Sequence, residues 1–279
     1  MKNIRFYWMY GNPEGNDKEY LSSLLDDLEN AGYYSVMFPY DPFLGDWMLK
    51  IAPVTKMEYK IKYLFAIRTY AISPEYMAMM LNQFDEYYPN KAMLNVLAGD
   101  KTQMSREQEI DDTLNSALLM DRFFKYPEER IVYTNNWLNK FVNLKILKRK
   151  PEIAITGTSD LTLQNVKEYG DYVGCMNYAY INETERYNLI SEKRIVVAPI
   201  CLVDTEKEYL DMIKRSEEEE SFGRHSAIIG TKEIVIKKLR DLSDLGATDI
   251  MISKHHSMKD PKPIHDLVKY ILDNNIIQK

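Results

Sequence analysis

Apolar positions along the chain gather in short runs, and these runs predict strands. Several are apolar at nearly every residue, which is typical of parallel strands buried on both faces and not of half-exposed antiparallel strands. Eight runs have this character: Ile4–Met9, Tyr34–Phe38, Lys62–Ile67, Ala92–Leu97, Glu152–Thr156, Asp171–Met176, Ile195–Val203 and Asp249–Ser253.

The segments between these runs are amphipathic and predict helices. In Asp17–Ala31 apolar residues recur at helical spacing, and Gly32 follows as a natural helix end. Ser73 and Pro74 open a second helix as N-cap and first residue. Further helices are expected over Asp160–Tyr169, over Thr231–Leu245 before Gly246, and over Pro261–Leu272.

This alternation predicts a (β/α)₈ TIM barrel formed by a single domain over residues 1–279. Eight strands in 279 residues leave about 35 residues for each βα unit, close to the length such units need. A doubly wound open sheet is the alternative, but no GxGxxG motif follows Ile4–Met9. The one oversized connection is the helical stretch Ser105–Lys148, which Pro127 interrupts.

Composition and charge exclude several classes of function. The net charge is −6 and the isoelectric point is about 5.4, so neither nucleic acid nor an anionic membrane is an expected partner. No apolar stretch is long enough to span a bilayer, and the chain opens on a strand without a signal peptide. Cys175 and Cys201 lie in apolar runs, as reduced core thiols of a cytoplasmic protein do. Four scattered histidines predict no metal site.

In a barrel of this kind the functional residues follow the carboxyl ends of the strands. Here those positions are rich in aromatic and hydroxyl side chains, and they hold no paired carboxylates and no nucleophile–base pair. This composition argues against glycosidase and acyl-transfer chemistry and favours a flat aromatic ligand with a phosphate tail. The expected walls of its site are Tyr7, Trp8, Met9, Phe38 and Tyr70.

The best phosphate candidate is the segment Thr156, Gly157, Thr158, Ser159 and Asp160. A strand runs into small hydroxyl residues and a glycine, and a helix then begins. The free N–H groups of a first helical turn, its dipole and three hydroxyls together suit an anion. A Ser/Thr/Asp helix cap without any ligand is the open alternative.

Several segments resemble the luciferase-like flavin monooxygenases, most closely the alkanesulfonate monooxygenase branch. Lys62–Gln103 carries an arginine after the third strand, then "SP", a helix and an "NVLAG" strand in place of "NLVTG". Pro151–Asp160 matches "PxxxxGGSSD", and Ile229 to Gly246 matches "LVGTPEQV…LGI". The order and spacing of these motifs cover nearly the whole chain.

The resemblance implies FMN bound at the barrel mouth, with its phosphate at the loop after the fifth strand. It also implies ring or ribityl contacts from Thr69, Tyr70 and Asn95. The family has a further Arg-Tyr pair on a later helix near the phosphate. Arg130 matches the arginine, whereas the tyrosine position is Ile131 and Tyr133 follows two residues on.

The chain also departs from the alkanesulfonate branch, as a shortened member would. The seventh strand lacks the branch's arginine and histidine, and the second strand is not followed by its cysteine. The loop that closes the family's active site shrinks to Ser221–Ala227, where Arg224 and His225 are the candidate catalytic residues. A sulfonate substrate is therefore not expected.

The predicted function is a two-component FMN-dependent monooxygenase that receives reduced FMN from a separate flavin reductase and oxidises a small organic substrate. The alternatives are a non-catalytic flavin-binding protein of the same family and a deazaflavin-dependent oxidoreductase.

The helix Pro74–Tyr88 is apolar most of the way round, which predicts a homodimer through this helix. Coverage by Ser105–Lys148 is the other explanation of that apolar face.

Overall fold

Parallel strands form one closed sheet in the computed structural model, which describes residues 4–11, 18–40, 46–97, 127–157, 159–205, 207–212, 227–255, 258 and 260–277, without the side chains of 127–130. The strands are β1 (Arg5–Met9), β2 (Ser35–Phe38), β3 (Lys62–Ile67), β4 (Ala92–Leu97), β5 (Glu152–Thr156), β6 (Tyr172–Met176), β7 (Arg194–Leu202), β8 (Ile228–Gly230) and β9 (Asp249–Lys254). The eight predicted strands are all confirmed.

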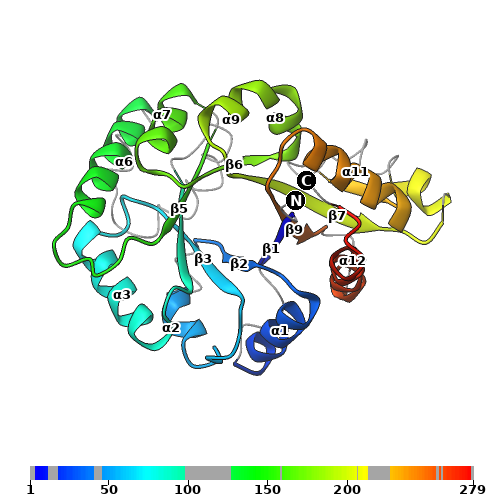
Figure 1. Ribbon diagram of the computed structural model, residues 1–279, viewed down its shortest axis with the longest axis horizontal. Helices are drawn as coiled ribbons and strands as arrows, with labels where there is room; N and C mark the ends of the chain where they lie inside the picture. The colour runs from blue at the N-terminus through cyan, green and yellow to red at the C-terminus, as the bar shows by residue number, and fades with distance from the viewer. Residues whose placement is uncertain are drawn as a thin grey trace.

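The barrel closes through eight of these strands, and β8 lies beside it. Strands β1 to β6 pair in sequence order, β6 pairs with β7, and β9 joins β7 to β1. The second half of β7 leaves β6 and pairs with β8 through Ile200–Leu202. The architecture is therefore a (β/α)₈ barrel with one additional short strand, and Figure 1 shows its helices surrounding the strands.

The helices of the described residues are α1 (Lys18–Ala31), α2 (Trp47–Ile51), α3 (Pro74–Tyr87), α6 (Pro127–Val142), α7 (Asp160–Tyr169), α8 (Asn177–Asn182), α9 (Thr184–Ile190), α11 (Lys232–Asp244) and α12 (Lys262–Asp273). The boundaries predicted for α1, α3, α7, α11 and α12 hold to within one residue, whereas α6 ends at Val142 and not at Lys148, and α2, α8 and α9 were not predicted. Ser73 caps α3 by accepting a hydrogen bond from the N–H of Tyr76, and Pro127 begins α6. Gly32 and Gly246 adopt φ of 81° and 114°, left-handed values that favour glycine after a helix.

Side chains alternate between the inner and outer faces of the strands and so form two apolar layers. On β3, Leu64 and Ala66 point into the barrel, whereas Phe65 and Ile67 pack outward against the helices. The outer layer is the larger of the two and takes in the buried faces of the helices. Tyr20, which the helical pattern assigns to the apolar face of α1, lies at its edge and is partly exposed.

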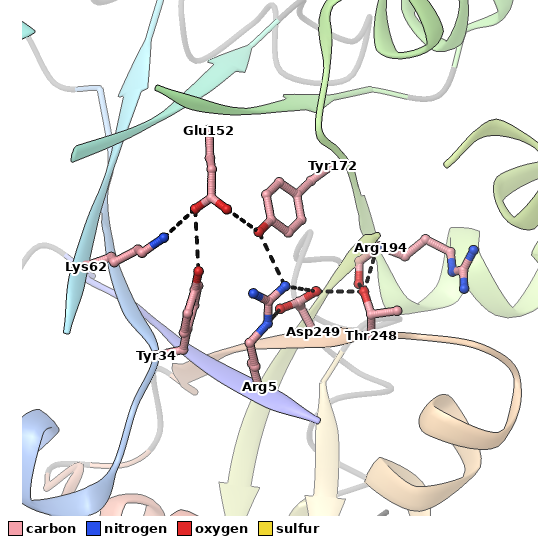
Figure 2. Close-up of polar contacts among 8 residues, drawn as sticks. All are labelled: Arg5, Tyr34, Lys62, Glu152, Tyr172, Arg194, Thr248 and Asp249. Atoms are coloured by element: carbon pink, nitrogen blue, oxygen red, sulfur yellow. Dashed lines mark hydrogen bonds and ion pairs between the residues drawn. The ribbon is translucent and has the colours of Figure 1, made fainter. Parts of the chain in front are cut away.

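A cluster of polar side chains fills the amino-terminal end of the barrel, where the strands begin (Figure 2). This amino-end cluster comprises the side chains of Arg5, Tyr34, Lys62, Glu152, Tyr172, Thr248 and Asp249, and the backbone of Arg194 bonds Thr248 at its edge. Its centre is the ion pair between Arg5 Nε and Asp249 Oδ1 at 2.6 Å, with Lys62 Nζ and Glu152 Oε2 at 2.6 Å beside it.

Two tyrosines connect these ion pairs. The Tyr172 hydroxyl donates to Glu152 at 3.2 Å and accepts from Arg5 at 3.3 Å, and the Arg5 guanidinium lies 4.3 Å from the Tyr34 ring centroid. Burial alone would raise the pKa of Glu152, but the hydrogen bond and charge of Lys62 outweigh it and lower that pKa. Positions at this end of a TIM barrel serve stability, and the pairing fits that role.

Cys175 and Cys201 are both buried and unbridged, as predicted. Burial raises the pKa of the Cys175 thiol well above its ordinary value. No group of metal-binding side chains occurs among the described residues. Within the same residues, no helix combines the length and hydropathy needed to cross a membrane.

His265 makes the stability of the outer layer dependent on pH. Its Nδ1 atom lies 3.2 Å from the Tyr33 hydroxyl, and its ring packs 4.6 Å from that of Trp8. Burial lowers the pKa of His265, partly offset by the nearby acidic side chains Asp27, Asp266 and Asp260. Because the folded pKa lies below the unfolded value of about 6.5, stability is complete above that pH and falls as acid protonates the unfolded chain.

We therefore expect the free energy of unfolding to decrease between pH 7 and pH 5, and His265→Gln to flatten that slope. Urea unfolding at the two pH values measures both. His255→Gln, which leaves His265 in place, is the matched control and should keep the slope. An equal slope in the wild type and His265→Gln would show that another group is responsible.

Candidate functional site

Buried polar side chains lie at the carboxyl ends of β3, β4 and β5, the edge of the barrel at which TIM-barrel sites occur. Thr69, two residues beyond β3, is buried, and its hydroxyl lies 3.0 Å from the hydroxyl of Thr134 on α6. Tyr70 follows in the same turn and is half-buried. The contact between the two threonine hydroxyls joins the turn after β3 to helix α6.

The next two strands are joined across the sheet by side chains. Thr156, the last residue of β5, donates its hydroxyl to Asn95 Oδ1 of β4 at 2.8 Å. Gly174 on the neighbouring β6 makes room for this contact, because a Cβ atom there would lie 2.5 Å from Thr156 Oγ1. This glycine is required for packing, and no sequence motif identified it.

The segment after β5 forms a tight loop and then a helix cap. Gly157 has φ of 156°, and a Cβ atom on it would lie 2.7 Å from Thr162 Cγ2, so the backbone passes close to the start of α7. The Ser159 hydroxyl accepts the N–H of Thr162 at 3.2 Å and lies 2.8 Å from its hydroxyl. The cap is present, and anion binding by the loop stays a prediction.

An arginine of a neighbouring helix pairs with the first turn of α7. The exposed carboxylate of Asp160 accepts from Arg186 Nη2 of α9 at 2.6 Å. Arg186 also pairs with Glu183, so it offsets the charge of Asp160 only in part.

Helix α6 lies against α7 and begins at the same edge of the barrel, since each helix returns from the carboxyl end of a strand. Asn135 of α6 donates to Asn165 of α7 at 2.8 Å. Tyr133 is half-buried against the outer apolar layer. Arg130 falls in the first turn of α6, and its side chain lies outside the described atoms.

The predicted site is thus only partly brought together by the described residues. Asn95 and Thr156 lie on the adjacent strands β4 and β5, Thr69 follows β3, and Gly157 and Ser159 follow β5. The remaining candidates, Thr158, Arg224 and His225, lie outside the described residues.

The interpretation of the walls needs correction for three residues. Tyr7 faces the barrel interior, but its ring lies 5.4 Å from that of Tyr34 in the amino-end cluster and does not reach the mouth. Trp8 packs in the outer layer against Tyr33 and His265, because its position on β1 faces the helices. Phe38 faces outward in the same way and stacks on Trp47 at 5.1 Å. The apolar side chains that do pack over the barrel interior near its carboxyl end are those of Met9, Tyr40, Leu97 and Met176.

A cavity of about 520 Å³ opens beside this edge, between the end of β3 and helices α2 and α3. Its lining residues are Tyr40, Asp46, Trp47, Met48, Phe65, Ala66, Ile67, Arg68, Ala71, Ile72, Ser73, Tyr76, Met77 and Met80. Sequence reasoning placed Arg68 on the rim but did not identify the cavity. The available signal was the short segment from Asp46 to Ile51, whose cap and aromatic first residue mark a small additional helix.

Comparisons with known proteins agree on the fold. Neither protein-family models nor curated proteins give a match to this sequence. Solved structures do: EDTA monooxygenase from Chelativorans sp. BNC1 superposes with a TM-score of 0.75 at 11% identity, covering 99% of this chain and 95% of that one. The oxygenating constituent of 3,6-diketocamphane monooxygenase from the CAM plasmid of Pseudomonas putida, in complex with FMN, gives 0.60 at 14% identity, with 96% of each chain covered.

A third solved structure extends the range of cofactors among the neighbours. Coenzyme F420-dependent tetrahydromethanopterin reductase from Methanopyrus kandleri gives a TM-score of 0.62 at 11% identity, covering 96% of this chain and 98% of that one. At such low identity these likenesses establish the fold alone. The chain shares the (β/α)₈ barrel fold with these enzymes.

Proposed function

We propose that this chain is an FMN-dependent monooxygenase that accepts reduced FMN from a separate flavin reductase and oxidises a small organic substrate. The observation that carries the proposal is the set of polar side chains toward the carboxyl ends of three adjacent strands: Thr69 after β3, Asn95 on β4 and Thr156 at the end of β5. These are the positions at which the sequence resembles the flavin monooxygenases.

The donor chemistry of this edge fits FMN in three parts. Hydroxyl and amide groups at Asn95 and Thr156 match the alcohols of a ribityl chain. The loop at Gly157 and Ser159, followed by the amino end of α7, matches a phosphate. The apolar surface that includes Met9 and Leu97 matches the flat ring.

Within that arrangement the protein's own contribution is binding, orientation and exclusion of water. When bound, reduced flavin supplies the electrons with which one oxygen atom of O₂ enters the substrate and the other leaves as water. The fixed Thr69–Thr134 and Asn95–Thr156 pairs hold the donors in place before the ligand arrives. Such preorganisation lowers the entropy cost of binding.

The solved structures similar to this chain support a flavin as the cofactor, and FMN is our proposal for which flavin it is. One is solved in complex with FMN and another is named as dependent on coenzyme F420. A second candidate function, flavin binding without catalysis, is favoured by the interior of β7. Val197 and Pro199 lie there, on the strand where the alkanesulfonate branch has an arginine and a histidine.

Affinity for the two redox states separates these functions. An enzyme that uses reduced FMN should bind it at least as tightly as oxidised FMN, whereas a carrier needs no such bias. Anaerobic titration of both forms, followed by turnover assays with a flavin reductase and O₂, is the test. Preferential binding of oxidised FMN with no effect on any substrate would favour the non-catalytic protein.

We also propose a homodimer through α3. Lys140 of α6 pairs with Glu75 at 2.6 Å, so α6 covers one flank of this helix. Tyr76, Met79 and Tyr87 nevertheless remain more than half exposed. An apolar stripe of this kind on a barrel helix suits a two-fold contact, in which each α3 covers the other.

The double substitution Met79→Glu with Tyr87→Glu should convert the dimer to a monomer, because charges would be buried in the contact. Light scattering at micromolar concentration measures the mass. Leu189→Glu on α9, which replaces another exposed apolar residue, is the control and should leave the dimer intact. A wild-type monomer under these conditions would contradict the proposal.

A further inference from the structure

The cavity beside β3 has the size and surface of a ligand pocket. Its volume of about 520 Å³ lies within the range of pockets that enclose small molecules. Aromatic and thioether side chains form most of its wall, among them Trp47, Tyr76, Met77 and Met80. Methionine side chains adapt to the shape of an apolar ligand, so this wall suits an organic group and not a hydrated ion.

Among its lining residues the cavity has a single cation, Arg68, and a single acid, Asp46. The Asp46 carboxylate is engaged as the N-cap of α2, where Oδ1 accepts the N–H groups of Met48 at 2.8 Å and Leu49 at 3.3 Å. Arg68, only 7% exposed, contributes the positive charge. A guanidinium held in an apolar wall pairs strongly and in two-pronged geometry with a carboxylate.

Trp47 provides a second polar feature. Its ring is fixed by stacking on Phe38 and by edge contact with Tyr10 at 5.0 Å. Its buried indole N–H has no acceptor among the described residues. Buried donors normally have partners, so this N–H group is an unusual polar feature beside the cavity.

The pocket also adjoins the proposed flavin position. Arg68 directly precedes Thr69, and it follows Ala66 by two positions, in register with the residues that face the barrel interior. The turn after β3 therefore contributes Arg68 to the cavity and Thr69 to the proposed flavin position. A substrate has to lie beside the cofactor that oxidises it, and a shared turn is compatible with that relation.

We propose that this cavity is the substrate pocket and that it selects an apolar, aromatic-sized molecule bearing a carboxylate, which Arg68 binds. The inference rests on the proposed monooxygenase function for its role and on the pocket alone for its ligand chemistry. The carboxylate fixes the orientation of the molecule, and the aromatic and methionine wall holds its body.

A matched pair of probes tests the ligand chemistry directly. 4-Phenylbutanoate and 4-phenylbutan-1-ol share one skeleton and differ in the charged group. Calorimetric titration of the wild-type protein should show at least about tenfold tighter binding of the acid. Arg68→Gln should remove this preference, and Arg68→Lys should retain part of it because the charge remains without the planar fork.

Lys50→Gln is the control, since it removes a cation 5.1 Å from the Trp47 ring that does not line the pocket. It should leave the preference intact. Circular dichroism and FMN titration of each variant separate loss of the pocket from loss of the fold or of flavin binding. Equal affinity for acid and alcohol, or a preference unchanged in folded Arg68→Gln, would overturn the inference. Flavin binding failing while the preference persists would overturn the proposed function instead.

Discussion

Ser159→Asp is expected to weaken FMN binding at least about a hundredfold while the protein stays folded. Aspartate caps a helix as well as serine, so α7 keeps its first turn. Its carboxylate would stand beside the phosphate, and two like charges at hydrogen-bonding distance in a partly buried loop cost several kcal/mol. Quenching of FMN fluorescence during titration measures the change.

Two control variants make the result specific. Ser159→Ala removes the cap without adding charge and should lower FMN affinity far less. Thr231→Asp adds the same charge at the start of α11, which α8 and α9 separate from α7 around the barrel in Figure 1, and should have no effect. Wild-type affinity in Ser159→Asp would mean that the loop serves only as a helix cap.

Arg5→Met is expected to lower the free energy of unfolding by about 3 kcal/mol, because it strands the charge of Asp249 inside the barrel. The Asp249 side chain is 0% exposed, and apart from Arg5 its side-chain partner is the Thr248 hydroxyl at 2.6 Å. Arg5 also donates to Tyr172, which loses that bond. Chemical denaturation with a two-state fit gives the change.

The comparison variants distinguish a stranded charge from simple loss of an ion pair. Adding Asp249→Asn to Arg5→Met should recover much of the loss, because no buried charge then remains unpaired. Lys237→Met, which removes an exposed pair with Asp241, should cost less than about 1 kcal/mol. Neither Arg5→Met nor the double variant should change FMN affinity, since the amino-end cluster lies at the far end of the barrel. A loss of similar size in Lys237→Met would contradict this account.

Much of the fold could be predicted because buried parallel strands and helix ends have strong local signals. Continuous apolar runs gave the strands, and Ser73, Gly32 and Gly246 marked helix boundaries that the structure reproduces. Strand β8 was not predicted, since three residues at Ile228–Gly230 are too short to show a period. Its pairing depends on β7 leaving β6, which is a property of the whole sheet.

The candidate site was less predictable, because a strand pattern says where a side chain lies but not which groups it contacts. The rim positions of Thr69, Asn95 and Thr156 followed from strand ends and resemblance, whereas their partners did not. Trp8 and Phe38 were misassigned to the mouth because rim position was considered without the inward or outward side of the strand.

The pocket beside β3 required three separate segments to meet. Asp46 and Trp47 precede Arg68 by about twenty residues, and Met77 and Met80 follow it on the next helix. No periodic pattern connects such positions in a single sequence.

A crystal structure of the protein with FMN tests the central claim most directly. The account predicts the phosphate within hydrogen-bonding distance of the backbone between Thr156 and Ser159, the ribityl chain beside Asn95, and the ring over the carboxyl end of the barrel. FMN bound elsewhere, or a protein that shows no bound FMN at millimolar concentration, would contradict it.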